Sequence, residues 1–196
     1  FCVFYLSRAS RTLMNELKTC PISKIEGEYS PPGDKSISHR LAMLGAIAEG
    51  KSHFTNFLSS DDCLRTIQAF QAMGVSFEPS GTELAVHGVG LRGLSKSKQE
   101  LNLGNSGTTM RLLLGILAGQ SFESRLTGDA SLCKRPMRRV TEPLRKMGAL
   151  IEGRDNGSYA PLAIRGGSLS GIGWRNEMAS AQVKSAILLA GLYAQG

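Results

Sequence analysis

Three apolar stretches of similar sequence recur along the chain at a nearly constant interval. They are residues 41–50 (LAMLGAIAEG), 111–120 (RLLLGILAGQ) and 188–196 (LLAGLYAQG). Their internal glycines, Gly45, Gly115 and Gly191, lie 70 and 76 residues apart. A repeat of this length indicates one supersecondary unit used three times, which restricts the possible folds more than any single motif does.

Each copy is predicted to begin a unit of alternating strands and helices. In the first copy we expect strands at residues 24–29, 52–57, 75–78 and 83–87, and helices at 38–48 and 63–73. In the second copy we expect strands at 100–103, 124–127, 149–152 and 161–164, a helix around 111–120, and a helix from Pro136 to Met147. The third copy starts near residues 171–174, forms a helix from Ala181 and stops at Gly196. This alternation predicts an α/β layer fold, and we expect the chain to end inside its third unit.

The first helix of each copy is apolar on nearly every face, as in residues 112–118 (LLLGILA). Helices of this kind are buried inside a domain. A glycine within such a helix lets a neighbouring backbone come close. We therefore interpret these residues as core and assign them no chemistry.

Cations and small hydroxyls gather where the repeated helices are predicted to begin. The first copy has a Pro-Pro-Gly turn followed by Lys35, Ser36 and Arg40. Asp34 or Ser36 is available to cap this helix. The corresponding segments of the other copies are residues 103–111 (LGNSGTTMR) and 179–184 (ASAQVK). Any one of them could be an ordinary cap, but three helix ends in register favour a site for an anion.

A nucleotide-phosphate loop is not expected at the first of these helix ends. That loop needs four residues between its first glycine and the closing Gly-Lys-Ser/Thr, whereas Asp34 alone separates Gly33 from Lys35. The anion would be held by side chains and helix ends together.

Residues 128–139 (GDASLCKRPMRR) form a fourth candidate. Arg135 directly precedes Pro136, which pushes Arg135 out of helical angles and holds it at a helix mouth. An arginine there can grip a carboxylate or a phosphate through two parallel hydrogen bonds. We interpret Arg138 and Arg139 as a solvated basic face.

Composition favours anionic partners, whether nucleic acid, a membrane surface or small acidic metabolites. The chain has 23 Lys and Arg against 16 Asp and Glu, a formal net charge of +7. The four cysteines are scattered, with no Cys-x-x-Cys pair, at Cys2, Cys20, Cys63 and Cys133. The three histidines show no metal-binding spacing either, so we predict no metal, no cofactor and reduced thiols in a cytoplasm-like compartment. No apolar run approaches the ~20 residues of a membrane span.

Residues 1–21 fit poorly with the rest of the sequence. They open on an apolar run that lacks a methionine and a basic segment, so a signal peptide is not favoured. We expect a poorly defined N-terminal extension over residues 1–21 and a folded domain over residues 22–196.

Four longer motifs follow one another along the chain. They are Pro-Gly-Asp-Lys-Ser-x-Ser-x-Arg at residues 32–40, Gly-Asn-x-Gly-Thr-x-x-Arg at 104–111, Gly-Asp-x-Ser-Leu-x-x-Arg-Pro-Met at 128–137, and Ser-Ala-Gln-Val-Lys-Ser at 180–185. Together they resemble the 5-enolpyruvylshikimate-3-phosphate (EPSP) synthase family over residues 22–196. The resemblance implies an inside-out α/β barrel built of repeated βαβαββ units, here one domain truncated in its third unit with the second domain absent. It also implies a cytoplasmic enzyme, monomeric at full length, that needs no cofactor and binds neither nucleic acid nor membrane.

The resemblance further implies transfer of the enolpyruvyl group of phosphoenolpyruvate to the 5-hydroxyl of shikimate 3-phosphate, with release of phosphate. The residues implied to bind shikimate 3-phosphate are Lys35, Ser36, Arg40, Ser180, Ala181 and Gln182. Those implied to bind phosphoenolpyruvate, where the herbicide glyphosate competes in sensitive members, are Lys35, Asn105, Gly107, Arg135 and Gln182. Lys35 is the expected catalytic residue, because a lysine beside the bridging oxygen can move a proton and stabilise developing charge. Since the family's second domain supplies further groups, we expect this chain alone not to turn over.

Two other functions stay open at this point. The sister family that transfers enolpyruvyl to UDP-N-acetylglucosamine shares the repeat architecture, but it typically has a Lys-Asn pair where this chain has Lys35 and Ser36. A basic nucleic-acid-binding module could be built on Lys134, Arg135, Arg138 and Arg139. Its charges are dispersed, however, and only 6% of residues are aromatic, which is little for stacking on bases.

Overall fold

The computed structural model describes residues 2–3, 20–21, 23–24, 26–177 and 179–196. The chain divides into two compact units, Phe1–Pro31 and Pro32–Gly196. In the first unit, β1 (Cys2–Val3) pairs antiparallel with β2 (Cys20–Pro21). The strand predicted at residues 24–29 is not formed by the described residues of that stretch. Most of the predicted extension, residues 1–21, lies outside the described residues, so its boundary stays a prediction.

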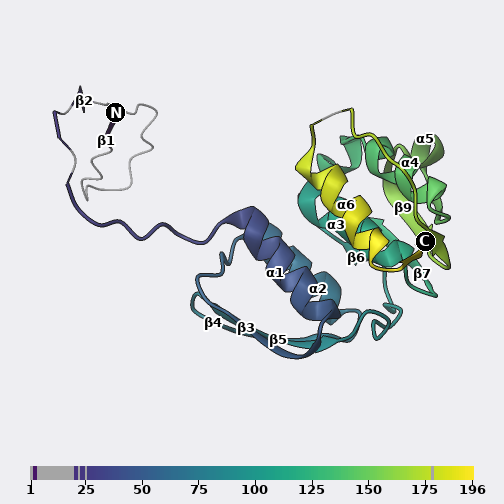
Figure 1. The fold of residues 1–196 in the computed structure, drawn as a ribbon, viewed down its shortest axis with the longest axis horizontal. Coiled ribbons are helices and arrows are strands. Elements are labelled where there is room, and N and C mark those ends of the chain that lie inside the picture. Colours follow the sequence, from purple (N-terminus) through teal and green to yellow (C-terminus); the bar gives the residue numbers. More distant parts are fainter. Residues whose placement is uncertain (1, 4–19, 22, 25, 178) are drawn as a thin grey trace. The chain divides into compact units, whose positions relative to one another are not determined.

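The second unit opens with two helices packed on a three-stranded sheet (Figure 1). Its elements are α1 (Lys35–Ile47), β3 (Glu49–Phe54), α2 (Asp61–Gln71), β4 (Ser76–Ser80) and β5 (Glu83–Val89). The strand order is β3-β5-β4, with both pairs antiparallel. Helix α1 begins three residues earlier than predicted, because Asp34 caps it by accepting a 2.7 Å hydrogen bond from the Ile37 amide.

A second sheet follows with the same arrangement of its last three strands. The elements are β6 (Leu101–Asn102), α3 (Gly107–Ala118), β7 (Glu123–Thr127), the 3-10 turn η1 (Leu132–Lys134), α4 (Arg138–Lys146), β8 (Leu150–Gly153), α5 (Arg154–Gly157) and β9 (Tyr159–Arg165). The strand order β6-β7-β9-β8 places β7, β9 and β8 as β3, β5 and β4 lie in the first sheet. Strand β6 adds a parallel partner to β7.

The prediction that Pro136 lies in the first helical turn is wrong. Helix α4 begins at Arg138, and Met137 occupies its N-cap position. Arg135 is extended (φ −80°, ψ 136°), as expected of a residue before proline. The proline within α4 is Pro143.

The last part of the chain repeats the parallel pairing seen around α3. Strand β10 (Leu169–Ser170) leads to α6 (Ala181–Gly191), and β11 (Ala194–Gln195) returns parallel to β10. The strand predicted at residues 171–174 therefore lies two residues earlier. The helix predicted through residue 196 ends at Gly191.

The prediction of helices buried on every face holds for α3 and is wrong for α1 and α6. All residues of α3 except Thr108 are buried. In contrast, Leu44 of α1 is 46% exposed and Leu188 of α6 is 62% exposed. Apolar composition shows that a helix can be buried, but the neighbouring elements decide which of its faces are covered.

The repeated glycines also differ in what they contact. A Cβ atom on Gly115 would collide with the backbone carbonyl of Ala186, so here two helix backbones do meet. A Cβ atom on Gly45 would first meet the side chains of Phe54 and Val86, and one on Gly191 would have no neighbouring element of the described chain within 4 Å. A Cβ atom on Gly88 of β5 would, however, lie 2.4 Å from the carbonyl of Gly45, so close backbone approach is confirmed at Gly115 and at Gly45 but not at Gly191.

The fold is mixed α/β, and α3 and α6 pack together beside the second sheet (Figure 1). The described residues do not close into a barrel, in contrast to the predicted inside-out barrel. No helix in the described part of the chain is both long enough and apolar enough to cross a membrane.

Candidate functional site

Lys35 lies in the first turn of α1 and forms an ion pair with an acidic residue that was not among the predicted site residues. Its ammonium forms an ion pair with the carboxylate of Asp62, in the first turn of α2. The Lys35 side chain is still 51% exposed, so its ammonium stays accessible to a ligand. Ser36, beside it, is exposed.

Arg40 links α1 to α6. Its Nη1 donates a 2.8 Å hydrogen bond to the backbone carbonyl of Ser36, one turn back along α1. Its Nη2 donates a 2.8 Å hydrogen bond to the hydroxyl of Ser185. The guanidinium is thereby fixed between two helices that are far apart in sequence.

The N-terminus of α3 is capped by Ser106, whose hydroxyl accepts a 3.2 Å hydrogen bond from the Thr109 amide. Gly107 follows as the first helical residue. A Cβ atom on Gly107 would lie 2.8 Å from Nη1 of Arg111 and 3.2 Å from Nη1 of Arg135. The absence of a side chain here therefore lets two guanidinium groups approach the helix end.

Arg135 is hydrogen-bonded to the loop before α3. It donates a 3.2 Å hydrogen bond to the backbone carbonyl of Asn105 and a second, short one to the side-chain oxygen of Asn105. The amide of Asn105 in turn donates to Asp129 at 2.6 Å. The Leu132 amide and then Asn105 lower the pKa of Asp129 by hydrogen bonding to its carboxylate.

Gln182, in the first turn of α6, lies against the first turn of α3. Its Oε1 accepts a 2.8 Å hydrogen bond from Arg111, and its Nε2 donates a 3.0 Å hydrogen bond to the hydroxyl of Thr108. Ser180 caps α6 by accepting from the Val183 amide, and Ala181 is the first helical residue. Ser180, Ala181 and Gln182 therefore lie at the N-terminus of α6, as predicted.

Arg111 is a functional candidate that sequence reasoning noted but did not assign. It is 95% buried, and all its hydrogen-bond acceptors are neutral: the carbonyls of Gly107 and Pro136 and the side chain of Gln182. Burial, and then the nearby charges of Arg139 and Arg135, lower the pKa of Arg111 to about 10. A buried cation among other cations favours an anionic ligand at this place.

The interpretation of Arg138 and Arg139 as solvated is right for one of them only. Arg138 is exposed and forms a 3.7 Å ion pair with Glu142 on the same helix. Arg139 is half-buried, and its Nε is buried without a hydrogen-bond partner among the described residues. Helical periodicity could have revealed the difference, since the two residues point to different faces of α4.

The predicted residues fall into two contiguous groups. Asn105, Gly107, Arg135 and Gln182 meet around Arg111, while Lys35, Ser36 and Arg40 occupy the first turns of α1. The hydrogen bond from Arg40 to Ser185, which lies three residues after Gln182, joins the groups. Guanidinium groups, an ammonium and three helix N-termini are suited to bind phosphates and carboxylates.

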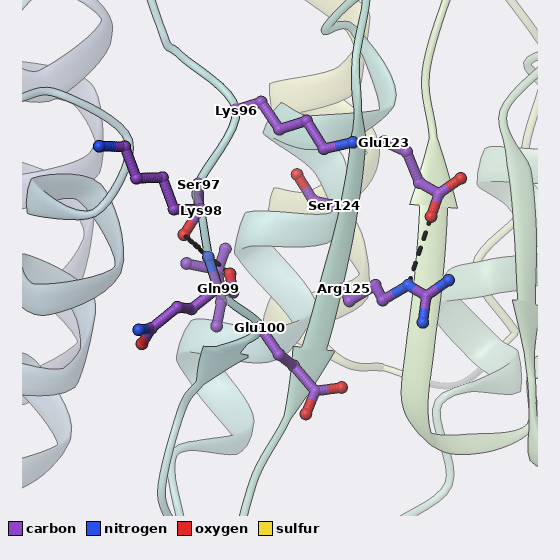
Figure 2. Close-up of a pocket in the computed structure, with 9 residues that line it drawn as sticks. Lys96, Ser97, Lys98, Gln99, Glu100, Glu123, Ser124 and Arg125 are labelled. Atoms are coloured by element: carbon purple, nitrogen blue, oxygen red, sulfur yellow. Dashed lines mark hydrogen bonds and ion pairs between the residues drawn. The ribbon is translucent and has the colours of Figure 1, made fainter.

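A separate cavity lies near the second sheet (Figure 2). It has a volume of about 230 Å³ and is lined by residues 96–101 and 123–125. Its wall includes a 3.4 Å ion pair between Glu123 and Arg125. None of the residues that line it belongs to the predicted site. Within the described ranges, His, Cys, Asp and Glu form no group of three or more that could hold a metal ion.

Comparison with known proteins places the chain in one family. The sequence matches the family model of EPSP synthase (3-phosphoshikimate 1-carboxyvinyltransferase) over residues 19–196. It is 57% identical to the 3-phosphoshikimate 1-carboxyvinyltransferase of Alkaliphilus metalliredigens and 56% identical to that of Bacillus licheniformis, in each case over 92% of this chain and 42% of the relative. The structure of EPSP synthase from Acinetobacter baumannii superposes with a TM-score of 0.84 at 55% identity, covering 87% of this chain and 39% of that one.

The chain thus spans about two fifths of the length of these relatives. Sequence, fold and the arrangement of cations at the helix ends agree with one another, and the chain belongs to the EPSP synthase family.

Proposed function

We propose that the protein containing this chain transfers the enolpyruvyl group of phosphoenolpyruvate to the 5-hydroxyl of shikimate 3-phosphate and releases phosphate. Family membership supports the reaction. The main structural support for the site is the hydrogen bond between Gln182 and Arg111. This bond brings the N-termini of α6 and α3 together with Arg135 in one cationic cluster. Both substrates carry a phosphate and a carboxylate, and such groups are bound by arginines and helix N-termini.

We assign two overlapping sets of residues, each drawn from both groups, to the two substrates. Shikimate 3-phosphate would be held by Lys35, Ser36, Arg40, Ser180, Ala181 and Gln182. Phosphoenolpyruvate would be held by Lys35, Asn105, Gly107, Arg135 and Gln182. Lys35 and Gln182 belong to both sets because they would lie where the substrates meet.

Lys35 is the proposed catalytic residue. The methylene carbon of phosphoenolpyruvate takes up a proton while the 5-hydroxyl attacks the adjacent carbon, giving a tetrahedral ketal. Loss of phosphate and of a proton from the new methyl group then yields the enolpyruvyl ether. An ammonium close to the bridging oxygen stabilises the charge that develops there and can donate a proton.

The remainder of the longer protein would complete both the fold and the site. We infer that the repeated βαβαββ units close into an inside-out barrel, and that a second such domain closes over the substrates and excludes water. We further propose that the full-length protein is a cytoplasmic monomer without affinity for nucleic acid or membranes. On this view the 196-residue chain binds ligand without turning it over.

The test measures phosphate release and binding separately. With both substrates present, the 196-residue chain should release no phosphate above background. Isothermal titration should nevertheless detect shikimate 3-phosphate, and Lys35→Ala should weaken that binding about tenfold, a loss near 1.4 kcal/mol. Lys51→Ala removes an exposed ammonium that is likewise paired with a carboxylate, Glu78, and serves as the matched control. Binding that is equal in both variants would contradict the assignment of Lys35.

The same titration distinguishes the sister reaction. UDP-N-acetylglucosamine should not compete with shikimate 3-phosphate. Competition would favour the sister enzyme.

A further inference from the structure

A line of buried polar side chains crosses three helices directly beneath the proposed site. His39 of α1, Thr66 of α2, and Ser106 and Thr109 at the start of α3 are each no more than 1% exposed. The Nδ1 atom of His39 lies 2.7 Å from the Thr66 hydroxyl, which lies 2.7 Å from the Thr109 hydroxyl. The Thr109 hydroxyl lies 2.7 Å from that of Ser106. We call these four residues the hydroxyl chain.

Counting donors and acceptors gives the hydroxyl chain a direction. If Ser106 donates to Thr109, Thr109 to Thr66, and Thr66 to His39 Nδ1, each hydroxyl gives its one hydrogen to an acceptor. The opposite direction would leave the Ser106 hydrogen without an acceptor among its described contacts, and the other acceptor near the Thr109 hydroxyl, the Asp62 carbonyl, lies farther away at 3.5 Å. In that direction His39 accepts at Nδ1 and carries its proton on Nε2, which is buried without a hydrogen-bond partner among the described residues. A neutral imidazole agrees with its environment, since burial lowers the pKa of His39 to about 4.

Both ends of the hydroxyl chain adjoin residues of the proposed site. His39 directly precedes Arg40 and lies one turn after Lys35 on α1. At the other end, Ser106 stands between Asn105, which holds Arg135, and Gly107, which faces Arg111. The middle residue, Thr66, lies four positions after Asp62, the partner of Lys35.

We propose that Thr66 and Thr109 are positioning residues that fix the mouth of α3 relative to the mouth of α1, and so set the span between the two substrate-binding groups. This inference rests on the proposed function for the identity of the ligands. Hydrogen bonds in a low-dielectric interior are directional and strong, so the hydroxyl chain holds a distance that apolar packing would leave adjustable. A purely structural role would not require hydroxyls, because isosteric apolar groups can be as stabilising in a core.

The test uses three variants of the 196-residue chain. Thr66→Val removes the central hydroxyl at nearly constant volume, and Thr66→Ser keeps it. Thr141→Val is the matched control: Thr141 is equally buried, and its hydroxyl bonds to Gly157 at 3.1 Å, outside the hydroxyl chain.

The first measurement needs no ligand. The amide of Thr109 donates to the N-cap hydroxyl of Ser106, and its hydrogen exchange should accelerate about tenfold in Thr66→Val, equivalent to about 1.4 kcal/mol of local stability. It should remain near the parent rate in Thr66→Ser and Thr141→Val. Nitrogen-15 NMR of the imidazole should show the Nε2–H tautomer of His39 in the parent chain. Equal exchange in Thr66→Val and Thr141→Val, or an Nδ1–H tautomer, would overturn the proposal.

The second measurement is the dissociation constant of phosphoenolpyruvate with shikimate 3-phosphate present. Thr66→Val should weaken phosphoenolpyruvate binding about tenfold and change shikimate 3-phosphate binding less than about twofold, with recovery in Thr66→Ser. Equal weakening of both substrates would indicate general loosening and would contradict positioning. A parent chain that binds neither substrate, yet gives the expected exchange pattern, would count against the proposed function alone.

Discussion

Arg40 and Ser185 are joined by a 2.8 Å hydrogen bond across 145 positions of sequence. The bond connects the first helix of the second compact unit to the last. Around it, Leu44 and Leu188 leave apolar surface exposed, and a groove of about 250 Å³ runs between α1 and α6. Among the described residues it is the one side-chain hydrogen bond between these two helices, and with the bond from Arg40 to the Ser36 carbonyl it fixes the guanidinium.

Removing the Ser185 hydroxyl should free the Arg40 guanidinium. A hydrogen bond to a charged group contributes about 1.5–3 kcal/mol, and the partial exposure of this one places the loss at the lower end in Ser185→Ala. Shikimate 3-phosphate binding should weaken severalfold because Arg40 loses its orientation. Urea unfolding and calorimetric titration measure the two effects. Ser97→Ala, on an exposed loop, is the control and should change neither.

The Gly107→Ala variant should weaken phosphoenolpyruvate binding about tenfold with little change in stability. The new Cβ would meet the ends of Arg111 and Arg135, and both guanidinium groups can shift away because their side chains are flexible. That shift moves both guanidinium groups away from the ligand. Alanine also has a higher helix propensity than glycine, which stabilises the helix by up to about 1 kcal/mol. Gly167→Ala, where no atom lies within 4 Å, is the matched control. Undiminished binding in Gly107→Ala would place the ligand elsewhere.

Arg111→Met should separate ligand binding from stability. Arg111 has only neutral hydrogen-bond acceptors among the described residues, and an apolar side chain avoids the cost of burying its charge, so the unfolding free energy should change by less than about 1–2 kcal/mol. Phosphoenolpyruvate binding should fall at least about tenfold, since a charge and the anchor of Gln182 are both lost. Arg138→Met removes an exposed guanidinium for comparison. A large loss of stability in Arg111→Met with normal binding would show that Arg111 serves the core.

His39 predicts a specific pH dependence of stability. The pKa of His39 is lowered to about 4, mainly by burial; Asp62 opposes this shift, while Lys35 and Arg40 contribute to it. Between about pH 6.5 and pH 4 the unfolded chain binds a proton that the folded chain does not, so stability falls as the pH falls through this window. The loss should approach about 3 kcal/mol near pH 4. Urea unfolding at several pH values should show a flatter profile in His39→Gln, and an unchanged profile would show that other groups are responsible.

Much of the candidate site could be predicted because its residues lie in continuous motifs. Lys35 follows a turn and a cap, so local rules were enough to place it at a helix start, and the proline after Arg135 was enough to predict the extended conformation of Arg135. The prediction for Pro136 failed because the 3-10 turn before it delays the start of α4. The ligand roles of these residues remain predictions.

The contacts that hold the site together could not be predicted from one sequence. Asp62, Thr66 and Thr109 are ordinary helix residues until the fold sets them beside Lys35 and His39. The exposed faces of α1 and α6 were missed for the same reason, because burial depends on neighbours that periodicity does not specify. Gly115 and Gly191 occupy similar sequence contexts and only one of them meets a backbone.

That contrast gives a further prediction. Gly115→Ala should destabilise the chain by roughly 1–3 kcal/mol, because its Cβ would press against the rigid backbone at Ala186. Gly191→Ala meets no atom within 4 Å and should be neutral or slightly stabilising. Urea midpoints of the two variants provide the comparison, and equal midpoints would contradict the close approach of α3 and α6.

The backbone contact between Gly115 and Ala186 also limits how α6 can move relative to α3. Because the backbones of α3 and α6 are in direct contact here, α6 cannot slide along α3 or rotate against it without a steric clash. Gln182 lies one turn before Ala186 on α6. Its orientation is therefore set by the contact of Ala186 with Gly115, a residue without a side chain. Changes in ligand preference among relatives should then arise as readily from helix spacing at such positions as from exchange of the groups that touch the ligand.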